Sequence, residues 1–546
     1  MVIEGVDALT DRIFPVCVVG SGPVGLAMAV DLARRGIDVL LLESGGKTAN
    51  GAVQALSAAH IVDPDRHDDM GIAVSRQLGG SSNLWGGRCI PFDPIDFESR
   101  DYVPTLWPIG ASDLAPYWER AVAATASGAA VYSAENPLVP PDGIFSDTAL
   151  ERWVNIQATQ DVFADEIASN PHLHVRTLAT MTQIHVDDTG RVEAIDIAHS
   201  LSGETVKVPI THLVIAAGGI ESARLLLSAQ RQNENLFGGS EGALGRYYMG
   251  HVIGEIADVV FRSPATAEAM DFYVDSHGSY VRRRFVPSAR VQRDHRLLNS
   301  AFWPVVPPVA DLRHRSSILS AVYLTLAFGP VGRLIVAEAI RRRHVRDKPQ
   351  DVLAHFGNMM TGLPSAIAFA ANFFRKRFGG PQRLPGFFIH NKANRYGLAY
   401  HSEQLPNRES RVWLDGGTDR LGMPKLAIDL RFLPEDAASI VRTHELLGDW
   451  LEKHELGQIE YRCPLDQREE AVLRLAAHGT HQIGLTRMGT NRMDAVVDAH
   501  LSTFDVPNLY VASCSVLPTS GQANPTLTAI ALSLRLADRL ASGIAA

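Results

Sequence analysis

The pattern of apolar and polar residues at the start of the chain predicts a strand, a tight turn, an amphipathic helix and a second strand. Residues 15–19 are mostly β-branched, and residues 37–43 form a second apolar run that ends in an acid. Between them, apolar residues recur at helical spacing over residues 26–33. This order is typical of the first βαβ unit of a nucleotide-binding domain.

Three glycines stand in the predicted turn, at Gly20, Gly22 and Gly25. In a dinucleotide-binding unit the first permits the turn, the second lets the backbone approach a pyrophosphate, and the third allows close helix packing. The amides and dipole at the start of the helix favour the same anion. Glu43 ends the second strand, where a carboxylate can accept from ribose hydroxyls. The unit predicts a bound dinucleotide, and the fingerprint alone serves both NAD and FAD.

Two further stretches suit such a site. Residues 76–97 combine glycines, serines and Asn83, which lay polar donors along a cofactor, with Trp85 as a packing surface. Residues 211–229 predict an apolar strand, a glycine turn and a helix. The alternatives are a surface turn cluster for the first stretch and an ordinary βα unit for the second. Trp85 argues against the surface interpretation of the first stretch.

The middle of the chain, residues 230–464, lacks nucleotide-binding signals and is predicted to carry most of a substrate domain. Residues 409–432 predict two strands around a glycine-rich turn, and residues 434–456 predict a capped amphipathic helix. Nothing in this region names a substrate.

Two uncharged stretches, residues 316–332 and 356–374, are each followed by clustered basic residues. Glycine and proline interrupt both, so a membrane-spanning helix is not predicted. One hypothesis places segment 316–374 on a bilayer surface or over an apolar substrate entrance. The other makes it buried helices with solvated basic ends, or an oligomer contact. The basic residues are Arg333, Arg341, Arg342, Arg343, Arg346 and the run 375–377.

Composition narrows the class of protein. A chain of 546 residues is too long for one simple hydrophobic core, so its length predicts two to four compact units. The net charge of −9, without a dense basic stripe, argues against a nucleic-acid partner. The four cysteines lack CxxC, CxxCH and zinc-like spacing, which disfavours a disulfide scaffold, a c-type haem and a thiol redox centre. The first residues lack the features of an export signal, so a cytoplasmic setting is expected, with membrane-surface contact as an addition to it.

The chain resembles the glucose-methanol-choline (GMC) family of flavin oxidoreductases in six segments that follow the family's order and span almost the whole chain. They are GSGPVG with Glu43, LGGSSNLWGG, AAGGIESARLLL, EQLPNRESRVWL, HQIGLTRMG and the stretch 508–540. The resemblance implies an α/β, Rossmann-like FAD-binding domain and a second, α+β substrate domain built on an antiparallel sheet. The implied boundaries are 1–110, 160–245 and 465–546 for the FAD-binding domain, and 111–159 and 246–464 for the substrate domain.

Three positions bear on how FAD is held. Some sugar-oxidising relatives carry a flavin-linked histidine in the loop that matches 79–87, but this chain has Leu84 there, so non-covalent FAD is expected. Ser513 stands where many members have aspartate, so the contact expected from that acid is not predicted. The family's backbone contact to adenine maps to about Met181. The expected FAD-binding positions are Gly20, Gly22, Pro23, Val24, Gly25, Glu43, Ser44, Gly79, Gly80, Ser81, Asn83, Leu84, Trp85, Gly86, Gly87, Met181, Ala217, Gly218, Ser513, Asn524, Pro525 and Thr526.

His481 lies in HQIGLTRMG, the form in which the family presents its active-site histidine, and Asn524 follows in GQANPTLT. The resemblance implies a His–Asn pair that faces the flavin. The residue types suit alcohol oxidation, because a carbinol C–H becomes hydridic only as its O–H proton leaves, which requires a base of near-neutral pKa. Asn524 can donate to the same oxygen. Pro525 is expected early in the C-terminal helix, whose first amides would face the flavin.

His478 suggests a different role for His481, that of a metal ligand. If the segment were helical, His478 and His481 would share one face and could form a two-histidine metal site. No acidic third ligand lies near in sequence, and the glycines argue against a long helix. No metal is therefore predicted, and cofactor packing is the other role considered for His481.

The sequence thus predicts FAD-dependent oxidation of an alcohol to a carbonyl, with proton removal by His481 and hydride transfer to flavin N5. A secondary hydroxyl of a sugar or glycoside is favoured, because the Trp85 loop and the His–Asn pair resemble the pyranose-oxidising branch. An apolar alcohol, such as a sterol or long-chain alcohol, is the alternative that segment 316–374 motivates. A flavin monooxygenase, an NAD(P)H-dependent reductase and a non-catalytic flavin-binding protein are the remaining alternatives. Oxygen, quinone and a carrier protein stay open as electron acceptors.

Overall fold

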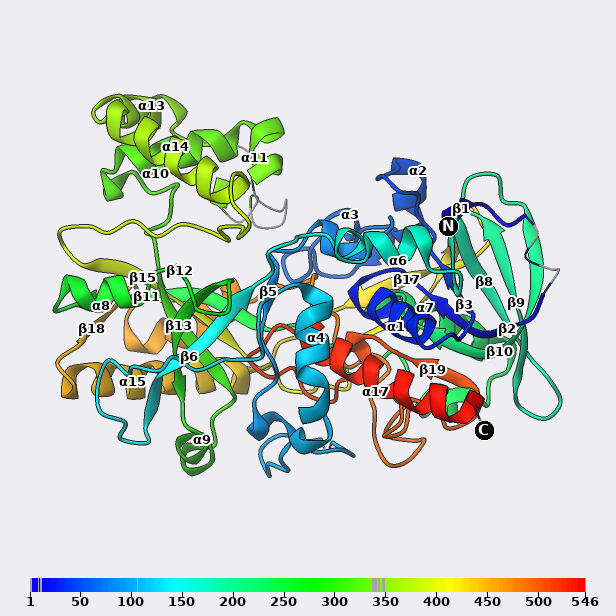
Figure 1. Cartoon of the computed structure of the whole chain (residues 1–546). Coiled ribbons are helices and arrows are strands. Elements are labelled where there is room, and N and C mark those ends of the chain that lie inside the picture. The colour runs from blue at the N-terminus through cyan, green and yellow to red at the C-terminus, as the bar shows by residue number, and fades with distance from the viewer. Residues whose placement is uncertain are drawn as a thin grey trace.

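The computed structural model of the chain contains two large sheets and one small sheet. In Figure 1 the mostly parallel sheet lies on the side that carries both termini, and the antiparallel sheet lies on the opposite side. The predicted class, an α/β domain joined to a domain on an antiparallel sheet, is confirmed. The structure describes residues 2–7, 9, 12–105, 107–335, 341, 344–345 and 349–545.

The first sheet has the strand order β1-β7-β3-β2-β10-β9-β8, and β19 also pairs with β10. Strands β1, β7, β3, β2, β10 and β19 pair in parallel, whereas β8, β9 and β10 pair antiparallel. The inner strands are continuous buried apolar runs, as expected for a parallel sheet covered by helices. The bounds are β1 Val2–Glu4, β2 Phe14–Val19, β3 Val39–Leu42, β7 Leu173–Thr177, β8 Ala179–Val186, β9 Val192–His199, β10 Thr205–Ile215 and β19 Leu509–Val511.

Three helices that start at the carboxyl edge of this sheet carry the predicted turns. Helix α1 (Pro23–Arg34) follows β2 and α7 (Gly219–Gln232) follows β10, so both predicted strand–turn–helix units are confirmed. Helix α17 (Thr526–Ala545) packs against α1. It begins one residue after Pro525, whose carbonyl accepts a 3.0 Å hydrogen bond from the amide of Ala529. Pro525 therefore precedes the first turn, and the expectation that it lies inside the helix was wrong by one position.

The second sheet is antiparallel throughout, with the order β18-β11-β15-β14-β13-β6-β5 and β12 paired to β13. Helix α15 (Pro434–Lys453) confirms the predicted capped helix and buries Ile440 and Leu447 against Phe285 and Phe302 of the sheet. The bounds are β5 Arg88–Cys89, β6 Phe145–Trp153, β11 Val252–Phe261, β12 Tyr273–Val274, β13 Tyr280–Pro287, β14 Ser300–Val305, β15 Arg395–Ser402 and β18 Gly457–Tyr461.

A small sheet confirms the two strands predicted around a glycine-rich turn. Strands β16 (Arg411–Thr418) and β17 (Pro424–Asp429) form the hairpin, and β4 (Ala59–Ile61) pairs in parallel with β17. Strand β4 lies in the range expected for the FAD-binding domain and β17 in the range expected for the substrate domain. The residue boundaries between the domains therefore stay a proposal.

A group of helices between β14 and β15 stands away from the antiparallel sheet (Figure 1). We call described residues 317–378 the helical projection. Its core contains Leu319, Tyr323 and Leu326 of α10. Arg342, Arg343 and Arg346, which the sequence analysis singled out, lie outside the described residues. The helices are α10 Ser317–Ala327, α11 Gly329–Ile335, α13 Val352–Met360 and α14 Leu363–Phe378.

Among the described residues, no helix combines the length and the apolar character that crossing a bilayer requires. The remaining α-helices of the described residues are short and lie in the connections between strands. They are α2 Gly51–Gln54, α3 Met70–Ala73, α4 Trp118–Thr125, α5 Thr159–Val162, α6 Ala164–Ser169, α8 Pro264–Ala269, α9 Ala289–His295 and α16 Arg468–Leu475.

Candidate active site

The turn after β2 has the shape that a pyrophosphate needs. Gly20 has a φ of +105°, and a Cβ there would lie 2.5 Å from the carbonyl oxygen of Ala216. A Cβ on Gly25 would collide with the carbonyl of Gly20, so close packing of α1 requires this glycine. Gly22 precedes α1, its Cβ position faces open space, and no side chain caps the helix. The uncapped first turn therefore leaves its amides available to an anion. Pro23 and Val24 form that first turn.

Glu43 lies buried just after β3 and joins the turn to its neighbours. Its carboxylate accepts from the Ser21 hydroxyl at 2.6 Å, the Ser21 amide at 3.1 Å and the Gly45 amide at 2.8 Å. Burial raises the pKa of this carboxyl in spite of these donors. A carboxylate has about four lone-pair directions, so a further donor can be accommodated. The predicted contact of Glu43 with a ribose stays a prediction, as does that of Ser44, whose hydroxyl accepts from Arg76.

The loop over residues 79–87 lies directly against the turn of α1. The amide of Gly79 donates to the Ser21 hydroxyl at 3.2 Å, and a Cβ on Gly80 would lie 2.9 Å from the Cα of Gly22. The indole N–H of Trp85 donates to the carbonyl of Gln157 at 2.7 Å, which fixes the ring. Asn83 donates to two carbonyls of its own loop, so its amide nitrogen orders the loop. Ser81 accepts from the amide of Ser75, and Leu84, Gly86 and Gly87 complete the loop.

The remaining predicted positions gather at the same edge of the sheet. Ala217 and Gly218 follow β10, and Ser513 follows β19, where its hydroxyl lies 2.5 Å from that of Ser515. Because parallel strands end at one edge, these residues lie with the turns after β2 and β3, where α/β sheets bind ligands. Met181 is buried in β8. The residue of β8 whose amide donates a hydrogen bond to the Glu43 carbonyl is Ala179. The adenine contact at Met181 stays a prediction.

Four histidines from three separate parts of the chain form one cluster. His251 immediately precedes β11, His401 lies in β15, and His478 and His481 lie in the non-helical segment after α16. One ring nitrogen from each lies within 4.8 Å of the others. His251, His401 and His478 are buried, whereas His481 is half-buried. His481 is therefore the most accessible of these four histidines.

Hydrogen-bonding rules fix the protons between this cluster and Asn524. The Nε of Arg88 lies 2.6 Å from the Oδ1 of Asn524, and a guanidinium has only donors, so this atom is the amide oxygen. The amide nitrogen of Asn524 therefore faces His481, whose Nε2 accepts across 3.1 Å. At the other end of the chain of bonds, a carbonyl oxygen can only accept, so His251 donates from Nε2 to Ser520 across 3.1 Å.

These two ends leave one arrangement for the contact between the rings. Because neutral His251 carries its proton on Nε2, the Nδ1 of His251 can only accept a hydrogen bond. The Nδ1 of His481, 2.8 Å away, is therefore the donor. His481 is thus held in the tautomer whose Nε2 carries a lone pair. A general base needs a lone pair at the atom that meets its substrate.

Burial keeps the supporting histidines neutral. Burial lowers the pKa of His251 to about 3, and the positive charge of Arg88 acts in the same direction. Burial, followed by the neighbouring His251, holds the pKa of His401 well below its usual range. The Nδ1 of His401 donates to the carbonyl of Gln522 at 2.6 Å, as a neutral ring with one N–H can.

The same cluster changes the argument about a metal. No acidic third ligand stands near His478 and His481 in the sequence, but the fold brings His251 and His401 to them from more than 70 residues away. Four imidazoles suit zinc, in which tetrahedral bonds of about 2.0–2.1 Å separate ligand nitrogens by about 3.3 Å. The Nδ1 atoms of His251 and His481 are 2.8 Å apart, which is a hydrogen-bond distance. The geometry thus favours the hydrogen-bonded arrangement, and the expectation of no metal stays a prediction.

Charged side chains of the antiparallel sheet hold Asn524 in place. Arg88 of β5 also pairs with the buried Glu151 at 3.1 Å, and Arg282 of β13 pairs with the same carboxylate. Burial would raise the pKa of Glu151, but the surrounding arginines lower it overall, so it stays ionised. Burial lowers the pKa of Arg88 to about 10, which still leaves it charged at neutral pH. The guanidinium that orients the amide is therefore itself fixed by an anion.

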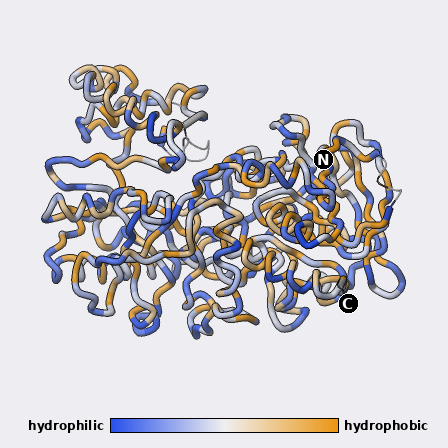
Figure 2. The backbone as a smooth tube through the Cα atoms, viewed as in Figure 1, coloured by the Kyte–Doolittle hydropathy of each residue, from blue (hydrophilic) through white to orange (hydrophobic). Residues whose placement is uncertain are grey.

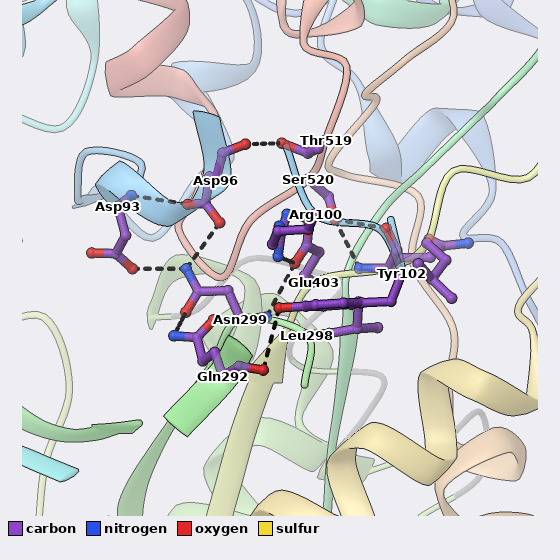
Figure 3. A network of polar contacts seen from close by, with 12 residues as sticks. Asp93, Asp96, Arg100, Tyr102, Gln292, Leu298, Asn299, Glu403, Thr519 and Ser520 are labelled. Atoms are coloured by element: carbon purple, nitrogen blue, oxygen red, sulfur yellow. Dashed lines mark hydrogen bonds and ion pairs between the residues drawn. The ribbon is translucent and has the colours of Figure 1, made fainter. Parts of the chain in front are cut away.

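A buried polar network anchors the loop before α17 (Figure 3). Arg100 and Glu403 form a two-bond ion pair with both distances at 2.7 Å, and the amide of Asn299 donates to Glu403 at 3.1 Å. The next residue, Gln404, donates its amide to the Ser520 hydroxyl at 2.8 Å. The network joins the end of β15 to the loop that carries the Ser520 carbonyl and Asn524. It therefore supports both ends of the hydrogen-bond chain through His481.

Helix α7 fixes the backbone next to His481. The amide of Ile220 donates to the side chain of Gln482 at 3.0 Å, and a Cβ on Gly219 would collide with the carbonyl of Gln482. The His478 ring stacks on that of His481 with 4.4 Å between centroids, although the segment is not helical. His481 is thus placed at the start of α7, beside the edge where the predicted cofactor positions gather.

Sequence reasoning identified His481 and Asn524 and missed the residues that orient them. His251 and Glu151 stand in segments without a recognisable spacing, whereas Arg88 and Ser520 lie within the stretches 76–97 and 508–540, which the sequence marks for other residues. The only hint for His401 is that it stands two residues before the EQLPNRE motif.

Comparisons with known proteins agree with this architecture. A family model described as "FAD dependent oxidoreductase" matches residues 15–314, and one described as "GMC oxidoreductase" matches residues 406–533. The 2-methyl-1,2-propanediol dehydrogenase of Mycolicibacterium austroafricanum is 24% identical over 96% of this chain and 94% of its own. The paromamine 6′-oxidase of Streptomyces fradiae is 23% identical over 98% and 92%. The structure of pyridoxine 4-oxidase from Mesorbium loti covers 97% of this chain and 99% of its own, with 16% identity and a TM-score of 0.50, and shows the same fold.

The fold, the glycine cradle and the matching family model, which spans more than half of the chain, define an FAD-dependent oxidoreductase. Within that class, the chain belongs to the GMC family. The predicted FAD and the predicted class of enzyme, one that acts on hydroxyl compounds, are thereby confirmed.

Proposed function

We propose that the chain oxidises an alcohol hydroxyl to a carbonyl with His481 as the base and Asn524 as a donor to the substrate oxygen. The hydrogen-bond chain from Arg88 to Ser520 carries this proposal, because it leaves the lone pair of His481 on Nε2 at the half-buried end of the cluster. FAD, when bound in the cradle at the edge of the parallel sheet, supplies the hydride acceptor.

The proton is handled by the histidines of the cluster. The substrate hydroxyl displaces the Asn524 amide hydrogen from His481 Nε2, and His481 then takes the hydroxyl proton at that atom while it continues to donate from Nδ1 to His251. The proton does not pass to His251, because the pKa of that buried ring lies near 3. It therefore stays on the half-buried ring of His481, from which it returns to solvent.

Asn524 orients the reacting oxygen. Its amide nitrogen carries two hydrogens, of which one points to His481 Nε2 and the other remains for the substrate. A donor fixed by Arg88 needs no reorganisation as negative charge develops on the alcohol oxygen.

The preferred substrate is a secondary hydroxyl of a sugar or glycoside. The cluster of imidazoles with Asn524 and Arg88 makes a polar site, which suits a polyol better than a hydrocarbon chain. An apolar alcohol such as a sterol or a long-chain alcohol is the second candidate, supported by the apolar surface of the helical projection. Oxygen, quinone and a carrier protein are the candidate electron acceptors.

FAD is proposed to be held without a covalent bond. The loop 79–87 contains no histidine, cysteine or tyrosine that could attach to the flavin. Denaturation in acid should release all yellow colour into the supernatant, and colour that stays with the precipitated polypeptide would contradict this.

The test is anaerobic reduction of the purified yellow protein by a panel of sugars, glycosides and apolar alcohols, followed by admission of oxygen. His481→Ala should retain FAD yet slow flavin reduction about 10²–10⁴-fold, the usual share of a positioned base. His60→Ala, at an exposed histidine of β4, is the control and should reduce at the normal rate. Loss of FAD with normal turnover per remaining flavin would show that His481 packs the cofactor instead. Bleaching by NADPH alone would favour a reductase or monooxygenase.

A further inference from the structure

The sequence segment that contains the helical projection differs in charge from the rest of the chain. Residues 312–392 contain ten arginines, three lysines and three acidic residues, a net charge of +10, within a chain whose net charge is −9. The remainder of the chain therefore carries −19. A positive charge concentrated in one segment of the sequence points to an anionic partner.

The projection also exposes apolar side chains to solvent. Among the residues that the structure describes, twenty large apolar side chains are exposed, and nine of them lie between residues 328 and 378. All four phenylalanines that are exposed in the described chain belong to this group. Leu353 is 87% exposed, Ile367 60% and Phe356 52%. A cluster of this kind marks an interaction surface, since scattered single residues would need no explanation.

The exposed apolar residues follow the outer faces of two helices. On α13, Phe356 and Met360 are four residues apart, and on α14, Ile367, Phe374 and Phe378 share one face. The adjacent face of α14 is already used, because Ala366 and Phe373 are buried there, each one position before an exposed apolar residue. Figure 1 places α13 and α14 beyond α10, at the end of the projection farthest from the antiparallel sheet, and Figure 2 shows hydrophobic stretches along this part of the backbone. An α-helix that is apolar on both faces needs a second apolar environment.

Basic side chains border this apolar surface. Arg375 and Lys376 are exposed in the last turn of α14, and Arg333 is exposed at α11. Apolar side chains bordered by lysine and arginine are the composition of a helix that lies in the interface of an anionic bilayer. A second copy that docked through the same surface would bring two positive surfaces together, which disfavours a symmetric dimer at this surface.

We infer that the helical projection docks the protein onto the surface of an anionic lipid bilayer. The outer faces of α13 and α14 lie in the boundary between headgroups and acyl chains, and the basic residues contact lipid phosphates. The helices do not cross the membrane in this arrangement, which leaves the His481 cluster on the aqueous side. This inference does not depend on the proposed reaction.

Flotation of the purified full-length protein with vesicles tests the inference. The protein should float with phosphatidylcholine vesicles that contain phosphatidylglycerol, should float much less with phosphatidylcholine alone, and should be released by high salt. Phe356→Ser with Phe374→Ser should abolish flotation. Arg375→Glu with Lys376→Glu should weaken the binding to vesicles by about fivefold or more for each basic residue replaced. This is the contribution that one lysine or arginine makes near an anionic surface.

Leu465→Ser is the matched control, because Leu465 is 63% exposed but lies outside the projection, and it should float as the unaltered chain does. All variants should keep bound FAD, which separates lost docking from misfolding. Equal flotation of the unaltered chain with both kinds of vesicle, or none with either, overturns the inference. Conversion of an oligomer to a monomer by the phenylalanine variants, without any lipid binding, shows a protein contact and also overturns it.

Discussion

The side chain of His251 decides which nitrogen of His481 can act as a base. Its Nε2–H is committed to the Ser520 carbonyl, so its Nδ1 accepts from His481 and keeps the lone pair of that ring on Nε2. The role resembles that of the carboxylate that orients a catalytic histidine, but His251 is neutral. His251 is therefore proposed to be a positioning residue, which acts on the substrate only through His481.

Replacement of His251 tests this role. His251→Phe removes the acceptor and should lower kcat about 10- to 100-fold with little change in KM, because a hydrogen bond to a group that becomes charged is worth about 1.5–3 kcal/mol. His251→Asn places an amide oxygen near the former Nδ1 and should restore most of the loss. The measurement is stopped-flow flavin reduction at matched FAD content.

His444→Phe is a suitable control, because His444 is a buried histidine of α15 whose ring packs on Phe302 and Tyr400. It should leave kcat unchanged. Equal losses in His251→Phe and His251→Asn, with lowered melting temperatures in both, would mean that His251 is only structural.

At the scale of elements, the end of β15 and the loop before α17 depend on one buried ion pair. Arg100 and Glu403 are almost completely buried and share two hydrogen bonds of 2.7 Å. Burial tends to lower the pKa of Arg100, but Glu403 more than offsets this and raises it. Removal of one partner leaves a buried charge without compensation, which is far more costly than the loss of an exposed pair.

Glu403→Ala should therefore lower the free energy of unfolding by about 3–5 kcal/mol. It should also weaken flavin reduction, because Gln404 no longer holds Ser520 firmly. Glu98→Ala removes the partner of Arg293 in an exposed pair of the same 2.7 Å length and should cost less than about 1 kcal/mol. Chemical denaturation of both variants makes the comparison, and similar costs would refute the assigned importance of the buried pair.

At the scale of the whole molecule, buried histidines make the fold sensitive to acid. Burial lowers the pKa of His444 to about 4, from an unfolded value near 6.5, and its Nε2 is a buried acceptor without a partner. The unfolded chain then binds more protons between these values, so stability is lost as the pH falls from about 6.5 through about 4. Burial raises the pKa of Asp436 to about 7, which acts in the opposite direction.

The difference in stability between His444→Phe and the unaltered chain isolates the contribution of His444 to the pH dependence. His444→Phe should be about as stable as the unaltered chain at pH 7.5 and about 2 kcal/mol more stable relative to it at pH 5. Denaturant titrations at several pH values make the measurement. Parallel stability curves for the two proteins would contradict a depressed pKa at this position.

The sequence by itself determined the features that depend on neighbouring residues. The βαβ unit with Gly20, Gly22 and Gly25 follows from periodicity and turn chemistry, and helix α15 follows from its capping and apolar spacing, because these signals are local. His481 and Asn524 were found because they stand in recognisable motifs. The unusual composition of residues 316–374 was also visible at once.

Only the tertiary structure decided how these residues work. His251, His401, Arg88 and Asn524 are each more than 120 residues from the others in sequence, and their contacts follow from sheet pairing instead of from spacing. The tautomer of His481 depends on the direction of hydrogen bonds donated by Arg88 and accepted by Ser520. The low pKa of His251 depends on burial, which is a property of the folded chain. Likewise, the sequence could not tell which faces of α13 and α14 remain exposed, because burial of a helix face is decided by what packs against it.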